Sequence, residues 1–111
     1  MLSIRFHPEK KYGMDEAELS PPYDVVADLL TSDVQHDPAY ARTLIEAFER
    51  VVRGEEAPME VQGNAYLIEV NAASTRVSTE FGTQPSCELP TPWLIDALQQ
   101  WLAYLERTRE S

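Results

Sequence analysis

The stretch TPWLIDALQQWLAYLERT at residues 91–108 places apolar side chains at spacings of three and four. On a helix this spacing forms one continuous stripe, made here by Leu94, Ala97, Leu98, Trp101, Leu102 and Leu105. Thr91 is a suitable N-cap and Pro92 fits the first turn. Burial of the five large stripe residues would contribute roughly 7–15 kcal/mol, at about 1.5–3 kcal/mol each. We therefore predict a core helix from Thr91 to about Arg107.

A strand pair is predicted immediately before this helix. Residues 65–71 and 75–81 each alternate apolar and polar side chains, with a short turn between them. A period of two on both sides of a short turn is typical of a β-hairpin. The sequence GTQP at residues 82–85 should end the ladder, and residues 86–89 are a candidate third strand.

In the first half of the chain, the sequence pattern predicts one strand, a loop and two helices. The strand covers residues 2–6 and should end at His7-Pro8, because proline cannot donate to a ladder. Residues 9–22 then read as a loop and residues 55–58 as a polar connection. A short helix is expected from Asp24 to Thr31, and a longer one begins at Pro38 after an Asp37 cap and ends before Gly54.

This order of elements predicts an α+β fold, because strands and helices occur in separate runs. We expect one small antiparallel sheet with helices packed on one face, in a single domain spanning residues 1–111. Within it, an acidic loop and helical part at 9–54 precedes a hairpin plus C-terminal helix at 61–107.

The charge of the chain is strongly one-sided. Nineteen acids against nine bases give a formal net charge of −10, and residues 14–41 hold seven acids and no Lys or Arg. Such a charge disfavours nucleic acid and anionic membranes as partners and attracts basic surfaces. Solubility alone is an equal alternative. The sequence has neither an apolar membrane span nor signal-peptide features at its start, so we expect a cytoplasmic protein.

No set of residues in the chain matches a known catalytic motif. The single cysteine, Cys87, rules out an internal disulfide and a cysteine-based zinc site, and His7 and His36 lack a metal-ligand spacing. The four glycines are scattered, so no phosphate-binding loop is expected. We therefore predict that the protein has no catalytic residue, binds neither a metal nor a cofactor, and is not an enzyme.

The alternative to this reading is a catalytic pair of carboxylates. Asp15 with Glu18, or Glu55 with Glu56, would be such a pair, although nineteen carboxylates make close pairs common by chance.

The second half resembles small bacterial immunity proteins of polymorphic and contact-dependent toxin systems, including the YacL-like group. The resemblance covers about residues 44–105 and is carried by VQGNAYLI at 61–68, RVSTEF at 76–81, LPTPWL at 89–94 and WLAYL at 101–105. Its matched positions are Gly63, Asn64, Tyr66, Val77, Phe81, Leu94, Trp101 and Leu105. The family's acidic loop after the second strand is replaced here by GTQP, so no toxin-contacting residue is transferred. The resemblance implies binding of a cognate toxin without catalysis.

Charge and resemblance together predict an immunity protein that occludes the active site of a basic toxin, for example a nuclease. Aromatic residues beside acids commonly anchor protein interfaces. The predicted contact residues are Tyr12, Asp15, Glu16, Glu18, Tyr23, Asp24, Asp28 and Asp33. The alternative is a non-catalytic regulatory or adaptor protein, homodimeric through an exposed strand edge or through Trp93 and Tyr104 on the flank of the last helix.

Overall fold

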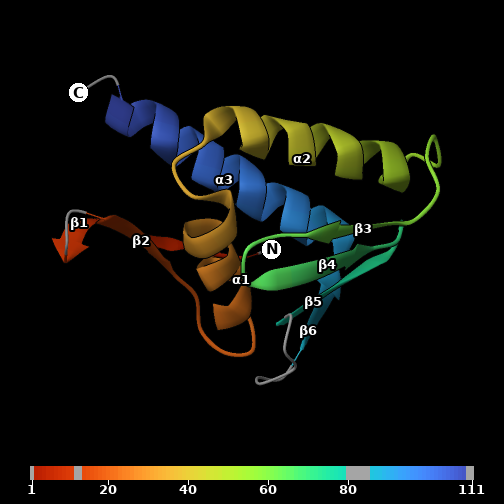
Figure 1. The fold of residues 1–111 in the computed structure, drawn as a ribbon, viewed down its shortest axis with the longest axis horizontal. Helices are drawn as coiled ribbons and strands as arrows, with labels where there is room; N and C mark the ends of the chain where they lie inside the picture. Colours follow the sequence, from red (N-terminus) through yellow and green to blue (C-terminus); the bar gives the residue numbers. More distant parts are fainter. Residues whose placement is uncertain (1, 12–13, 80–85, 110–111) are drawn as a thin grey trace.

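The computed structural model describes residues 2–11, 14–79 and 86–109 (Figure 1). The first half contains β1 (Arg5–Lys11), β2 (Met14–Glu18), α1 (Asp24–Leu29), a π-helical segment η1 (Leu30–Val34) and α2 (Pro38–Val52). The second half contains β3 (Met59–Gln62), β4 (Tyr66–Val70), β5 (Ser74–Thr79), β6 (Cys87–Pro90) and α3 (Thr91–Arg109). Within these residues, β3-β4-β5-β6 form an antiparallel sheet in chain order, and β1 and β2 form a separate sheet.

The helices lie on one side of the four-stranded sheet, with α2 and α3 side by side (Figure 1). The strands present alternate residues to this side: Ile68 and Val70 of β4 and Val77 of β5 are buried, whereas Arg76 is exposed. Because the register pairs Ile68 with Val77, the apolar side chains form continuous rows across the sheet. The predicted α+β fold, with a hairpin followed by a third strand and a closing helix, is confirmed.

The C-terminal helix is the central core element. Its predicted stripe is buried apart from the half-buried Leu102, and Trp101 has no exposed surface. The Trp101 indole N–H donates to the backbone carbonyl of Gln35 at 2.8 Å, so its single polar group is satisfied within the core. Gln35 ends η1 with a φ of 59°, a conformation that L-residues rarely adopt.

The β1–β2 hairpin explains why Tyr104 is not on the surface. Tyr104 was expected on the exposed flank of the helix, but only 6% of it is exposed. Phe6 of β1 stacks on the Tyr104 ring at a centroid distance of 4.6 Å and also lies against Trp101 at 6.0 Å. The hairpin therefore covers a part of α3 that would otherwise face solvent.

Two predictions for the first half are wrong for one reason. The strand does not end at His7-Pro8 but continues to Lys11, and β2 occupies much of the predicted loop at 9–22. In a two-stranded sheet each strand has an open side, and the β1–β2 register shifts between His7 and Lys11. A proline without an N–H is tolerated at such edges and irregularities.

Smaller differences concern the element ends. Strand β3 was not predicted, because only four residues of mixed polarity form it. Helix α1 ends at Leu29 and η1 extends the helical run to Val34, beyond the expected Thr31. The predictions for residues 80–85 lie outside the described residues.

No helix in the described part of the chain combines the length and apolar character needed to cross a membrane.

Replacing Trp101 by alanine should lower the free energy of unfolding by about 3–5 kcal/mol, because it empties the largest fully buried site in the core. Urea unfolding followed by circular dichroism measures the change. Gln99→Ala, at an exposed position of the same helix, should shift stability by less than about 0.5 kcal/mol. A near-neutral Trp101→Ala variant would contradict the packing described above.

Candidate functional site

An acidic hollow lies between β2 and α1. Its volume is about 260 Å³, and it is lined by Ala17, Glu18, Leu19, Asp24, Ala27, Asp28 and Thr31. Three of these residues are acidic, and each of the three is exposed. The structure therefore brings together three of the predicted contact residues, from a strand and a helix that are separated by a turn.

Local structure accounts for this arrangement. Asp24 and Asp28 are four residues apart on α1 and share its outward face, because Val25, Val26 and Leu29 point into the core. Glu18 is the last residue of β2 and pairs with Arg5 across the hairpin, both in the strand register and in an ion pair of 3.6 Å. That ion pair is well exposed, so it contributes little to stability.

Asp28 is held at the rim of the hollow by a tyrosine of the sheet. The Tyr66 hydroxyl donates a hydrogen bond to the Asp28 carboxylate, and Tyr66 is 3% exposed. Burial raises the pKa of Tyr66 far above its ordinary value, and the hydrogen bond to Asp28 acts in the same direction. Tyr66 therefore stays a proton donor at physiological pH and fixes the Asp28 carboxylate in place.

Asp33 joins η1 to the turn between β3 and β4. Its carboxylate accepts hydrogen bonds from the backbone N–H groups of Ala65 at 3.0 Å and Tyr66 at 3.1 Å, in the turn between β3 and β4. Burial raises the pKa of Asp33 and outweighs these bonds, which act to lower it. Both oxygens of this half-buried carboxylate are thus engaged within the protein, and we assign it a structural role.

Gly63 makes the Asp33 contact sterically feasible. A Cβ atom built on Gly63 would lie 2.1 Å from Asp33 Oδ2, far inside van der Waals contact. The Gly63-Asn64-x-Tyr66 pattern therefore combines a glycine required by Asp33 with a tyrosine that binds Asp28. The pattern was visible in the sequence, but its two partner carboxylates were not, since they are more than thirty residues away.

The remaining predicted contact residues are distributed differently. Tyr23 is half-buried and packs against Trp93 at a ring distance of 6.1 Å, so it joins the start of α1 to the start of α3. Tyr12 lies outside the described residues. The backbone of Asp15 and Glu16 forms part of β2.

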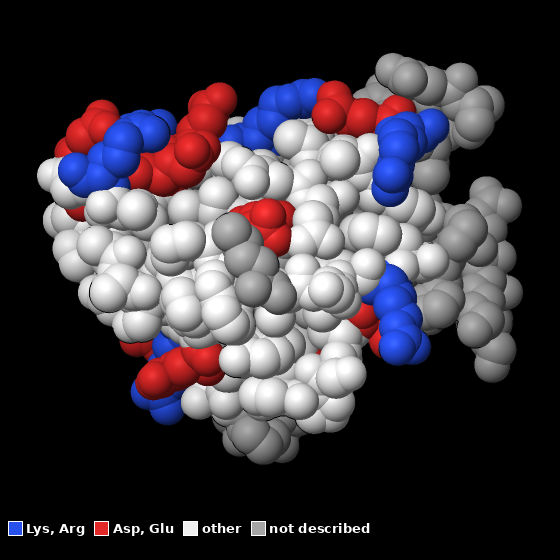
Figure 2. Space-filling view, turned by 180° about the vertical axis from the view of Figure 1, so that it is seen from behind, with Lys and Arg blue, Asp and Glu red and all other residues white. Residues whose placement is uncertain are grey.

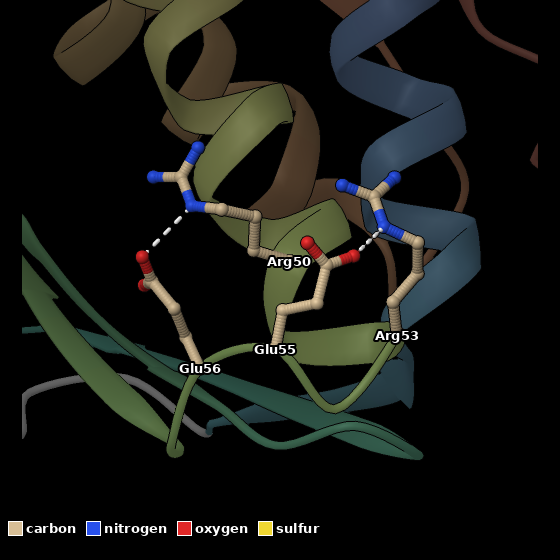
Figure 3. Close-up of polar contacts among 4 residues, drawn as sticks. All are labelled: Arg50, Arg53, Glu55 and Glu56. Atoms are coloured by element: carbon tan, nitrogen blue, oxygen red, sulfur yellow. Dashed lines mark hydrogen bonds and ion pairs between the residues drawn. The ribbon is translucent and has the colours of Figure 1, made fainter.

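The Glu55 and Glu56 carboxylates do not face one another. Glu56 Oε1 accepts from Arg50 Nε at 2.8 Å, and Glu55 pairs with Arg53, as Figure 3 shows. The two ion pairs flank the turn at Gly54, whose φ of 77° suits a glycine after a helix C-terminus. This arrangement supports the end of α2. Among the side chains that are described, no group of three or more His, Cys, Asp or Glu residues is suited to hold a metal ion.

The thiol of Cys87 lies in an environment that disfavours the thiolate. Only 2% of Cys87 is exposed, and burial raises the pKa of the thiol, followed by the negative charges of Asp24 and Glu88. Native protein should therefore react with iodoacetamide at neutral pH at least about tenfold more slowly than urea-unfolded protein. Mass spectrometry of timed samples measures both rates. Equal rates would contradict a buried Cys87.

Gly63→Ala should lower the free energy of unfolding by about 1–3 kcal/mol, because the added methyl group meets the Asp33 carboxylate. In an Asp33→Ala background the same change should be much less destabilising. Chemical unfolding of the two single variants and the double variant tests this coupling. Strictly additive effects would show that Asp33 does not constrain residue 63.

Comparisons with protein-family models, curated proteins and solved structures found no match to this chain. The resemblance to immunity proteins of the YacL-like group therefore stays a prediction from sequence motifs.

Proposed function

We propose that this protein is an immunity protein that binds a basic protein toxin in the cytoplasm and blocks the toxin's active site without catalysing a reaction. The observation that carries the proposal is the acidic hollow, in which Glu18, Asp24 and Asp28 converge in a chain of net charge −10. Such a surface attracts a positively charged protein over a long range and accelerates its association.

The hollow suits a lysine or arginine side chain. Its walls include Ala17, Leu19 and Ala27, which can contact the methylene stem of such a side chain. Its carboxylates can accept charge-assisted hydrogen bonds from the head group. Asp28 is already oriented by Tyr66, so part of the ordering required for binding is made in advance.

A nuclease is the toxin class that this surface fits best. A nuclease must hold phosphates in a positively charged cleft, and an acidic inhibitor can occupy the same cleft. The resemblance of the sequence motifs and the charge of the chain support this class independently of each other, because the matched residues of the resemblance include no acid.

A second candidate function is that of a homodimeric adaptor. Figure 2 shows a face with a broad area free of charged side chains, although the chain is strongly acidic. Of the exposed residues of α3, Pro92, Gln99 and Ala103 are uncharged, whereas Glu106 and Arg107 near its end are charged. Concentration-dependent dimerisation in analytical ultracentrifugation, together with the lack of a basic partner, would favour this function.

The leading proposal is tested by capture with the tagged protein from the source bacterium at low and moderate salt. We expect one basic partner that is released by salt and whose toxic activity the protein inhibits. Glu18→Gln with Asp24→Asn should weaken binding by roughly tenfold or more and flatten its salt dependence, because two charges leave the acidic hollow.

The matched control is Glu46→Gln with Glu106→Gln, which changes the net charge equally at exposed positions of α2 and α3. The control should bind nearly as tightly as the unmodified protein. If both double variants lose the same affinity, general charge and not the acidic hollow is responsible. If neither loses affinity, the proposed contact surface is wrong.

A further inference from the structure

Strand β3 is an open edge of the four-stranded sheet. It pairs with β4 on one side, and no strand of the described residues pairs with its other side (Figure 1). An open edge presents unpaired backbone groups and can accept a further strand from another chain.

The hydrogen-bond pattern settles the direction of the Glu60 peptide groups. The Gly63 N–H donates to the Tyr66 carbonyl at 2.8 Å, which makes Gly63 and Tyr66 a bonded pair. Bonded and non-bonded pairs alternate along an antiparallel ladder. With Val61 opposite Ile68 and Glu60 opposite Glu69, the Glu60–Glu69 pair is non-bonded. The N–H and C=O of Glu60 therefore point away from β4, toward the open edge.

The side chains beside this edge carry unneutralised negative charge. Glu60 and Glu69 lie directly opposite each other, and like charges in this position are destabilising. Within the described chain, neither residue takes part in an ion pair. Arg76 is in register with Glu69, but its Nε–H donates to Ser86 Oγ at 3.2 Å.

A shallow hollow adjoins the same edge. Its volume is about 350 Å³, and its lining comprises Pro58, Met59, Glu60, Glu69, Val70 and Asn71. The two glutamates thus border a space that a side chain of an added segment could enter.

We propose that β3 pairs with an extended, positively charged segment of a partner protein, which adds a strand to the sheet and places a lysine or arginine beside Glu60 and Glu69. The backbone of the segment would bond to the outward peptide groups of Glu60, and its cation would neutralise the opposed glutamates. Such main-chain pairing supplies affinity, while the cation supplies specificity.

Charge decides between this partner and a second copy of the chain. A second copy paired through β3 would bring another Glu60 and Glu69 to the same edge, and each copy carries a net charge of −10. Both effects oppose self-association. The proposal goes beyond the proposed function, because the β3 edge is a different surface from the acidic hollow and shares no lining residue with it.

The test uses ¹⁵N-labelled protein and a six-residue peptide that alternates valine with lysine. On binding, the peptide should slow hydrogen exchange of the Glu60 amide at least about tenfold, because a free edge N–H becomes bonded. The control peptide has the same sequence with N-methyl groups on the backbone nitrogens that would face β3. It keeps the charge and should give no protection.

A matched pair of variants tests the role of the charge. Glu60→Gln should weaken the affinity for the lysine-containing peptide about two- to fivefold, as expected for the loss of one exposed charge pair. Glu88→Gln removes the same charge from β6, on the opposite edge of the sheet, and should leave binding unchanged.

Three results would overturn the proposal. Equal binding of the methylated peptide would show that charge alone is recognised. Equal effects of Glu60→Gln and Glu88→Gln would show that the β3 edge is not the contact. Protection of the Glu60 amide that rises with protein concentration in the absence of peptide would identify a second copy as the occupant.

Discussion

Two carboxylates of the acidic stretch join the first half of the chain to the sheet. Asp33 binds the backbone of the β3–β4 turn, and Asp28 binds the hydroxyl of Tyr66 on β4. Both come from the helical run of α1 and η1, whose apolar side is buried in the same core. The position of this run also sets one wall of the acidic hollow and brings the carbonyl of Gln35 to Trp101. The attachment of this helical run to the sheet and one wall of the candidate site thus involve the same two carboxylates.

The acids of residues 14–41 have different roles in the structure. Asp37 caps α2 by accepting a hydrogen bond from the Tyr40 N–H, and Asp33 holds a turn. Glu18 and Asp24 are exposed in the acidic hollow. Asp28 has both kinds of role, since it binds Tyr66 and also lines the acidic hollow. The charge density of a sequence therefore overstates the charge that a partner can contact. Among the described acids of residues 14–41, Glu18, Asp24 and Asp28 are exposed and line one hollow beside α1.

The sequence predicted those elements whose pattern is local. Helix α3, the β4–β5 hairpin and the Asp37 cap follow from spacing and from residue type, and the structure confirms them. The β1–β2 pairing was missed because Pro8 lies inside β1 and the strands alternate weakly. The burial of Tyr104 was missed because Phe6, almost a hundred residues away, covers it. Contacts that join distant segments leave no periodic signal in either segment.

The close approach of Gly63 to Asp33 has an evolutionary consequence. A side chain gained at position 63 is destabilising while an aspartate occupies position 33, and it becomes acceptable once that aspartate is lost. The order of substitutions along a lineage would therefore matter, with position 33 changing first. In descendants of such a lineage the two positions should vary together, although thirty residues separate them in the chain.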